Sequence, residues 1–164
     1  MKRFFITFYV LMLLSCSVFG QNKVTIKGGT MVPVEAVRNV RAVEVHVGQN
    51  VDFQVVRDVV QDGVVVIPTG TIVKGNVFEA KRSTAFGTKG RLGIKLTHLN
   101  LPSGDVVNFS SSDVYIQGKN RTPLSVVIFL FTCLPFPCGS KAELKTGVEY
   151  EARVANNTLV TLNY

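Results

Sequence analysis

Short glycine turns between runs of β-branched residues constrain the fold of this 164-residue chain more than any other feature. The stretch "VVVIPTGTIV", residues 64–73, places Pro-Thr-Gly between two apolar runs. "LNLPSGDVV", "AELKTGVEY" and, more loosely, "IKGGTMVPV" have the same form. A turn residue such as proline, followed by a glycine that accepts a positive φ angle, lets a strand reverse within three residues. The pattern therefore predicts repeated short hairpin loops.

Alternation of apolar and polar residues predicts the strands between these turns. In "AVEVHVG", residues 42–48, three valines alternate with Glu44 and His46, and "VDFQVV" from residue 51 continues the pattern. A period of two with one apolar face is typical of a half-buried strand. In "VVQDGVVVI" the dipeptide Asp62-Gly63 separates two apolar runs, which predicts a tight hairpin because both residues tolerate positive φ.

These elements together predict an all-β fold. Helical periodicity is almost absent, no long linker interrupts the chain, and "VANNTLVTLNY" adds a final turn and strand. We expect residues 21–164 to form one domain, an antiparallel β-barrel or sandwich built from short hairpins. An apolar insertion near residues 123–139 interrupts this pattern.

The N-terminus has the form of an export signal. "MKRFF" carries two positive charges, an apolar stretch of about eleven residues follows, and small residues come next. This stretch is too short to span a membrane. Two cleavage sites compete: one removes residues 1–20, and the other removes residues 1–15 so that Cys16, in the lipobox-like "LLSC", is lipidated. We expect an exported protein of the periplasm or outer membrane, lipid-anchored if Cys16 is acylated.

Either cleavage leaves Cys133 and Cys138 as the remaining cysteines. An even pair in an exported chain is a candidate disulfide, although geometry and not spacing decides the bond. The two are not spaced as Cys-x-x-Cys, so we expect no redox centre. His46 and His98 have no Cys or His at ligand spacing, so we expect no metal site.

A basic loop gives the chain its main local concentration of charge. The net charge is +7, and removal of residues 1–20 leaves 16 − 11 = +5. The stretch "AKRSTAFGTKGRLG", residues 80–93, has two interpretations: a solvated hairpin tip, or a loop that binds a polyanion with one aromatic contact. It lacks the Gly-Lys-Ser/Thr of a phosphate loop. The candidate contact residues are Lys81, Arg82, Phe86, Lys89 and Arg91.

The stretch "PLSVVIFLFTCLPFPCG", residues 123–139, contains no charged residue. It is long for a strand and short for a spanning helix. Three interpretations remain: a core strand followed by a proline-stiffened loop, an apolar lobe that inserts into a bilayer or a partner, and a short buried helix. An exposed apolar stretch is normally an interaction surface. Its candidate contact residues are Val127, Ile128, Phe129, Leu130, Phe131, Leu134 and Phe136.

The stretches "VIPTGTIVKGNVFEAKR" and "GTKGRLGIKLTHLNLPSGDVVNF" carry a family resemblance. A Pro-x-Gly-Thr turn leads to a strand that reaches a glycine, a basic residue opens the next strand, and a Pro-x-Gly-Asp turn follows. This order, over roughly residues 29–107, resembles the β-barrel domain of the TrbI family, the outer-membrane core subunits of conjugation and type IV secretion machines. It is also similar to small exported bacterial β-domains.

The resemblance implies a β-barrel with a lobe, inserted between strands, that contacts or crosses the outer membrane. Residues 123–139 follow the second turn motif, where such an insertion would lie. Members of the TrbI family carry an N-terminal inner-membrane anchor and a long proline-rich linker, whereas this chain begins with a cleavable-type signal and has almost no linker. We therefore expect the barrel module alone and not a complete energy-transducing subunit.

No nucleophile, base and orienting group can be assembled from the sequence. The two histidines lie in alternating strand patterns and the carboxylates are scattered. We therefore expect no enzyme, cofactor, small-molecule substrate or nucleic-acid partner. We predict a non-enzymatic cell-envelope module that contacts a membrane or an envelope protein through residues 123–139. The alternative is a soluble periplasmic protein that binds polyanions through the basic loop, residues 81–91.

Overall fold

The computed structural model describes residues 22–83, 89–110, 112–118 and 140–162. Within these ranges the regular secondary structure is β-strand, which confirms the predicted all-β class. No helix in the described part of the chain is long and apolar enough to cross a membrane. The strands are β1 (Asn22–Ile26), β2 (Met31–Ala36), β3 (Val40–Arg41), β4 (Asn50–Val55), β5 (Val59–Gln61), β6 (Val64–Ile67), β7 (Ile72–Lys81), β8 (Arg91–Asn100), β9 (Val106–Asn108), β10 (Asp113–Gln117), β11 (Glu143–Leu144), β12 (Glu149–Arg153) and β13 (Thr158–Leu162).

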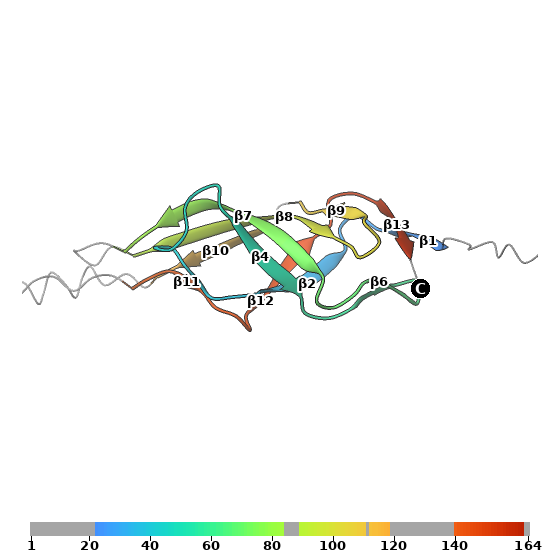
Figure 1. Cartoon of the computed structure of the whole chain (residues 1–164), viewed down its shortest axis with the longest axis horizontal. Coiled ribbons are helices and arrows are strands. Elements are labelled where there is room, and N and C mark those ends of the chain that lie inside the picture. The colour runs from blue at the N-terminus through green and yellow to red at the C-terminus, as the bar shows by residue number, and fades with distance from the viewer. Residues whose placement is uncertain (1–21, 84–88, 111, 119–139, 163–164) are drawn as a thin grey trace, which may run out of the picture.

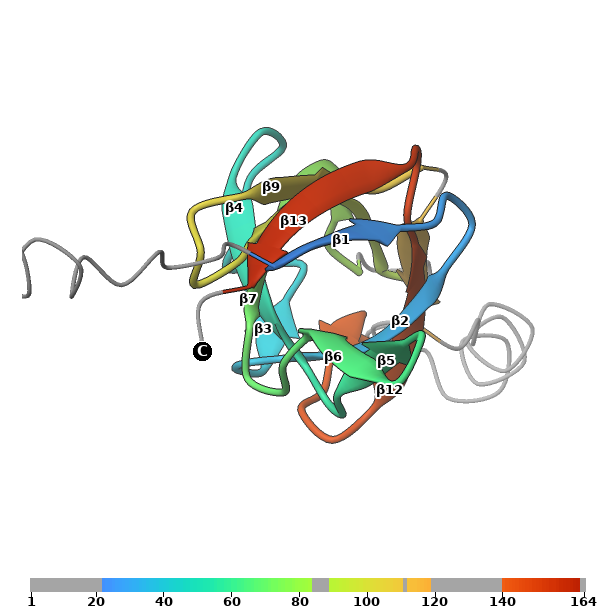
Figure 2. The same cartoon turned by 90° about the vertical axis from the view of Figure 1, so that its right-hand side faces the viewer.

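A strongly curled seven-stranded sheet forms the body of the molecule (Figure 2). Its strand order is β10-β8-β7-β4-β2-β12, with β9 paired to β8, and each pairing is antiparallel. The curl brings the two edges of the sheet together beyond β9, where Phe109 and Val154 form an isolated bridge. The Ala155 amide also donates to the Asn108 carbonyl there (2.8 Å). The sheet is therefore a half-barrel whose edges meet at one place.

Three two-stranded sheets complete the architecture: β1 with β13, β3 with β11, and β5 with β6. Seen end-on, β1–β13 and β5–β6 lie on opposite sides of the central axis (Figure 2). Seen from the side, β1 and β13 lie at one end of the molecule, and the hairpin end of β7–β8 lies with the end of β10 at the other (Figure 1). The first and last described residues are therefore far from the β7–β8 hairpin end.

The core lies inside the curl and follows the predicted alternation of β4. Val51, Phe53 and Val55 are buried, whereas Asp52 between them is exposed, so this prediction is confirmed. The Phe53 ring meets Tyr150 of β12 edge-on, with ring centroids 6.4 Å apart. Desolvation at this position raises the pKa of Tyr150 above its ordinary value. This ring contact joins β4 and β12, the two strands that flank β2, inside the curl.

The turn predicted at Asp62-Gly63 is confirmed. Gln61 pairs directly with Val64, so the loop between β5 and β6 has two residues. Asp62 has φ 53° and Gly63 has φ 81°. Positive φ at both central positions is the geometry of the type I′ turn, whose twist matches that of the flanking strands.

The glycines of the repeated motif adopt the left-handed conformation that the sequence predicts: φ is 86° at Gly29, 77° at Gly70, 91° at Gly104 and 77° at Gly147. Only the Gly104 turn joins two strands that pair with each other, β8 and β9. The other three turns join strands of different sheets. The hairpin predicted at each of these three places is therefore wrong in its pairing, although the turn is correct.

The Gly70 turn shows why. The Gly70 amide donates to the Val55 carbonyl (2.8 Å), and the Val55 amide donates to the Thr71 carbonyl (3.0 Å). The turn therefore bonds to the end of β4 and not to β6. A left-handed glycine reverses the chain, but the partner of the next strand depends on which distant edge is free.

The strand predicted over residues 42–48 is wrong. These residues form turns, and of the three valines only Val45 is buried, while Val47 is 66% exposed. Gly48 takes φ 89°, which ends any extended run, and its amide donates to the Val77 carbonyl (2.7 Å). The alternating valines of residues 42–48 do not form a buried face. The hydrogen bonds of the turns therefore decide the conformation of this segment.

Candidate functional site

The described residues that flank the two irregular stretches of the sequence lie at the same end of the half-barrel. β7 ends at Lys81, and Lys81 pairs directly with Arg91, the first residue of β8. Gln117, the last residue of β10, pairs with Arg91 from the other side. The predicted hairpin at residues 80–93 is therefore confirmed in its strands, and its described ends lie beside the end of β10.

Main-chain hydrogen bonds join the positions that bracket these stretches. The Gly118 amide donates to the Gly90 carbonyl (3.0 Å), and the Gly90 amide donates to the Ser140 carbonyl (3.2 Å). Gly118 and Ser140 are the described residues on either side of positions 119–139. The chain thus leaves for the apolar stretch and returns from it at neighbouring points, next to the basic hairpin.

Both glycines at this joint allow an unusually close approach of backbones. A Cβ atom on Gly90 would lie 2.8 Å from the Ala142 nitrogen, and a Cβ on Gly118 would overlap the Ser140 carbonyl oxygen. Neither obstacle is a side-chain end that can swing aside. Glycine is therefore the residue that fits at each position.

We call the cations around this joint the basic end: Lys81, Arg82, Lys89, Arg91 and Lys141. Lys81 and Arg91 share one carboxylate, since each approaches Glu79 Oε1 at 3.7 Å. For Arg82, Lys89 and Lys141, no carboxylate of the described chain lies within 4.0 Å. Five cations against one carboxylate leave a local net charge of about +4.

Neighbouring groups of the basic end are held in place by polar contacts. The Lys89 ammonium donates to the Gln117 side-chain carbonyl, which fixes this cation over the end of β10. The side chain of Tyr115, two residues earlier on β10, is hydrogen-bonded to the side chain of Glu79. Desolvation against the sheet raises the pKa of Tyr115, and the Glu79 carboxylate raises it further.

The structure brings together four of the predicted polyanion contacts, Lys81, Arg82, Lys89 and Arg91, on the two strands of one hairpin and its base. Lys141 was missed by sequence reasoning. The available signal was its position just after the apolar stretch, where it flanks that stretch together with Ser140. A flanking lysine in an irregular segment does not indicate which strand ends it will meet.

The remaining predicted site residues, for lipidation, a disulfide, polyanion binding and membrane or partner contact, lie outside the described residues. These are Cys16, Phe86, Val127, Ile128, Phe129, Leu130, Phe131, Cys133, Leu134, Phe136 and Cys138. His46 is exposed in a turn, and the His98 ring lies 3.2 Å from the Thr97 hydroxyl. In the part of the chain that the structure describes, no group of three His, Cys, Asp or Glu residues is placed to hold a metal ion.

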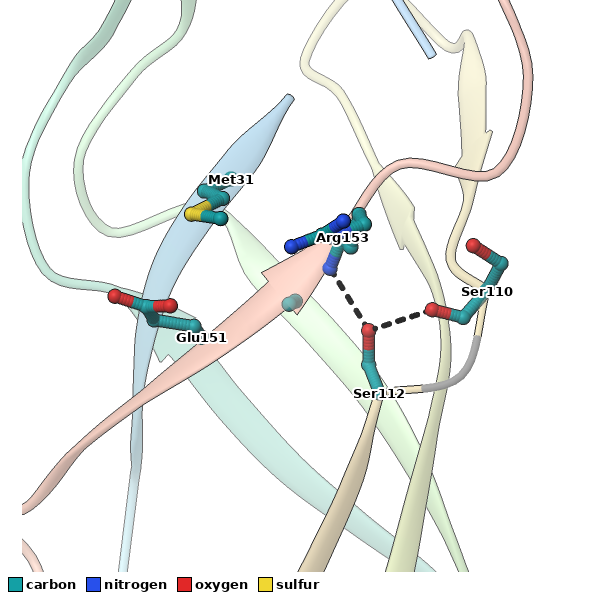
Figure 3. A pocket seen from close by; sticks show the side chains of 6 residues that line it. Met31, Ser110, Ser112, Glu151 and Arg153 are labelled. Carbon is teal, nitrogen blue, oxygen red and sulfur yellow. Dashed lines mark hydrogen bonds between the residues drawn. The ribbon is translucent and has the colours of Figure 1, made fainter. Parts of the chain in front are cut away.

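A pocket of about 410 Å³ lies where β12 meets the segment that leads into β10 (Figure 3). The Ser112 hydroxyl accepts a bond from the Arg153 amide (2.8 Å) and donates to the Ser110 carbonyl (3.1 Å). Both roles of this hydroxyl are therefore taken by main-chain groups, whereas a nucleophilic serine needs a base as its partner. Ser112 connects the two sheet edges here. The lining residues are Met31, Ser110, Ser112, Glu151, Ala152 and Arg153.

Searches against protein-family models and curated proteins find no match to this sequence. Among solved structures, the chain is similar to ComB10 of the Com type IV secretion system of Helicobacter pylori. The two share 13% sequence identity with a TM-score of 0.42, over 85% of this chain and 91% of that chain. A TM-score this low carries no argument about the function of the present protein.

Proposed function

We propose that this protein is a non-enzymatic module of the bacterial cell envelope that contacts a membrane or an envelope protein through residues 123–139 at its basic end. The export-type N-terminus supports the location. The pair of bonds from Gly118 to Gly90 and from Gly90 to Ser140 is the observation that carries the proposal. It means that the described residues on either side of an uncharged apolar stretch lie beside a cluster of cations at one end of the β-body.

An apolar stretch beside several cations suits contact with an envelope surface. Apolar side chains gain free energy when they leave water, at roughly 25 cal/mol per Å² of buried area. Cations nearby are attracted to acidic lipids or acidic protein surfaces, and the attraction is strongest at low salt. Neither contribution requires a catalytic group. The module would therefore act by attachment and positioning.

Serine substitution of apolar residues tests this contact. We expect the mature chain, residues 21–164, to bind isolated envelope membranes, and we expect Phe129→Ser with Phe131→Ser to weaken binding about tenfold or more because two large apolar side chains are lost. Leu159→Ser is the matched control, since Leu159 is 66% exposed on β13 at the opposite end. Equal binding by all three proteins would refute the proposed contact.

Mass spectrometry of the mature N-terminus tests the envelope location. A diacylglyceryl group on Cys16 would indicate a lipid-anchored protein, and a chain that begins at Gln21 would indicate a free periplasmic one. Either result agrees with the proposal. An intact N-terminus on protein recovered from the cytosol would contradict it.

A second candidate is a soluble periplasmic protein that binds polyanions, and the basic end favours it. Four of its cations come from the β7–β8 hairpin and its base. Such a protein would be retained on immobilised heparin or lipopolysaccharide and released steeply with salt. Unchanged retention after charge reversal at Lys81, Arg82, Lys89 and Arg91 would eliminate it.

A further inference from the structure

We infer that the basic end binds the anionic headgroups of a phospholipid bilayer and holds the half-barrel with β1 and β13 directed away from that bilayer. This rests on the proposed function and deepens it in two ways. It names the chemistry of the surface, and it gives the molecule an orientation.

Charge is distributed unevenly along the long axis. The basic end has a local net charge of about +4. At the opposite end, Lys23 lies close enough to Asp105 to lower its pKa, and the Lys27 amide is bonded to Gln61, next to Asp62. The region around Lys23 and Lys27 thus also contains two carboxylates, Asp62 and Asp105, so an anionic surface would attract the basic end more strongly than this end.

Outside the basic end and Glu79, the described chain carries nine Lys or Arg side chains and ten Asp or Glu side chains, so the rest of the body has no positive excess. Two of these cations are in close ion pairs. Lys74 lies 2.8 Å from Asp52, and Arg57 lies 3.1 Å from Glu149. A cation that already has a carboxylate partner gains little from a second anion. Arg82, Lys89 and Lys141 have no such partner in the described chain. The net positive charge of the described chain is therefore concentrated at the basic end.

A bilayer fits this end better than a free polyanion does. The joint at Gly90 places the cations beside the positions where the uncharged apolar stretch begins and ends. Only a membrane surface offers both phosphate groups and an apolar interior within a few ångströms. Stable membrane attachment generally requires two such signals, since one basic patch or one apolar anchor alone binds weakly and reversibly.

The orientation has a consequence for Cys16. Five residues, 17–21, separate Cys16 from Asn22 of β1, and the six Cα-to-Cα steps between them span at most about 22 Å when fully extended. The ten residues of β7 alone extend about 33 Å toward the basic end. A lipid on Cys16 therefore cannot reach the bilayer on which the basic end rests. A lipidated molecule would connect two surfaces.

Vesicle sedimentation tests the chemistry. The mature chain, residues 21–164, is mixed with vesicles of phosphatidylglycerol and phosphatidylcholine, or with vesicles of phosphatidylcholine alone. We expect at least tenfold tighter binding to the anionic vesicles. Lys89→Glu with Lys141→Glu should weaken that binding about 25-fold or more, since each cation near an anionic surface contributes about fivefold. The matched control, Lys23→Glu with Lys27→Glu, should bind like the wild type.

Each other outcome has a defined meaning. Equal binding to both vesicle types, unaffected by either pair of substitutions, would overturn the inference and leave the proposed apolar contact standing. Binding to heparin without binding to anionic vesicles would also overturn it, in favour of a soluble polyanion partner. Equal weakening by both substitution pairs would show that overall charge, and not the basic end, is responsible.

Fluorescence quenching by spin-labelled lipid tests the orientation. A fluorophore is attached at Arg82→Cys or at Thr25→Cys, each in a chain with Cys133→Ser and Cys138→Ser. We expect strong quenching at position 82 and almost none at position 25, which lies on β1 at the opposite end. Equal quenching at the two positions would overturn the proposed orientation.

Discussion

The joint at Gly90 makes a sharp prediction about stability. Gly90 is buried, and a Cβ atom added there would meet three main-chain atoms: Ala142 N at 2.8 Å, Lys81 O at 3.3 Å and Ser83 N at 3.4 Å. Its φ angle is not in the left-handed region, so Gly90→Ala introduces no backbone strain of its own. Any cost must come from crowding.

The expected cost follows from two opposing contributions. Crowding in a well-packed region costs about 1–3 kcal/mol, whereas alanine reduces the freedom of the unfolded chain and stabilises by about 0.4–1 kcal/mol. If the backbones separate, the Gly90–Ser140 and Gly90–Gly118 bonds weaken, at about 1 kcal/mol each. We therefore expect Gly90→Ala to lower the free energy of unfolding by about 2–3 kcal/mol.

Urea unfolding followed by far-ultraviolet circular dichroism measures this difference. Gly28→Ala is the matched control, because its nearest neighbours would lie at 3.4 Å and its φ is also outside the left-handed region. We expect that control to be neutral or slightly stabilising. A free energy of unfolding for Gly90→Ala within about 0.5 kcal/mol of that of the control would refute the close approach of backbones at this joint. Binding to anionic vesicles should fall in parallel, since the joint positions the basic end.

Two further substitutions test the buried core and the hydrogen bonds that Asp105 accepts. Phe53→Ala should cost about 3–5 kcal/mol in urea unfolding, because the ring is fully buried and contacts Tyr150 edge-on, and a loss below 1 kcal/mol would contradict that packing. Asp105 accepts hydrogen bonds from the Thr161 amide (2.7 Å) and the Ser103 hydroxyl (2.9 Å), which lower its pKa below the ordinary value of an aspartate. Because its pKa is lowered in the folded state, the ionised Asp105 carboxylate stabilises the fold at pH values above its ordinary pKa, and this stabilisation is lost as the pH falls. Asp105→Asn should therefore have a lower urea midpoint than the wild type at pH 7. That difference should shrink below about pH 4, and a difference independent of pH would refute the role of this carboxylate.

Local chain chemistry was predictable from the sequence. The left-handed conformations of Gly70 and Gly104 and the two-residue turn at Asp62-Gly63 follow from residues within the turn itself. The buried face of β4 followed from the alternation through Phe53, because that strand has one wall against the core. In each case, neighbours in the sequence supply the decisive energies.

Partnerships between distant segments were not predictable. The Gly70 turn bonds to Val55 and not back to β6, and residues 42–48 alternate without forming a strand. The same limit hid Lys141 from the candidate site, since nothing near it in the sequence indicates that Ser140 meets Gly90.

The sequence by itself determined the alternation of strands and glycine turns in this protein, its basic hairpin and its uncharged apolar stretch. Only the tertiary structure decided that the hairpin and the positions bracketing the apolar stretch share one end of the half-barrel, opposite β1 and β13. The physical reason is that torsion angles depend on residues a few positions apart. Strand pairing depends instead on which edges remain free once the whole sheet has curled around its core.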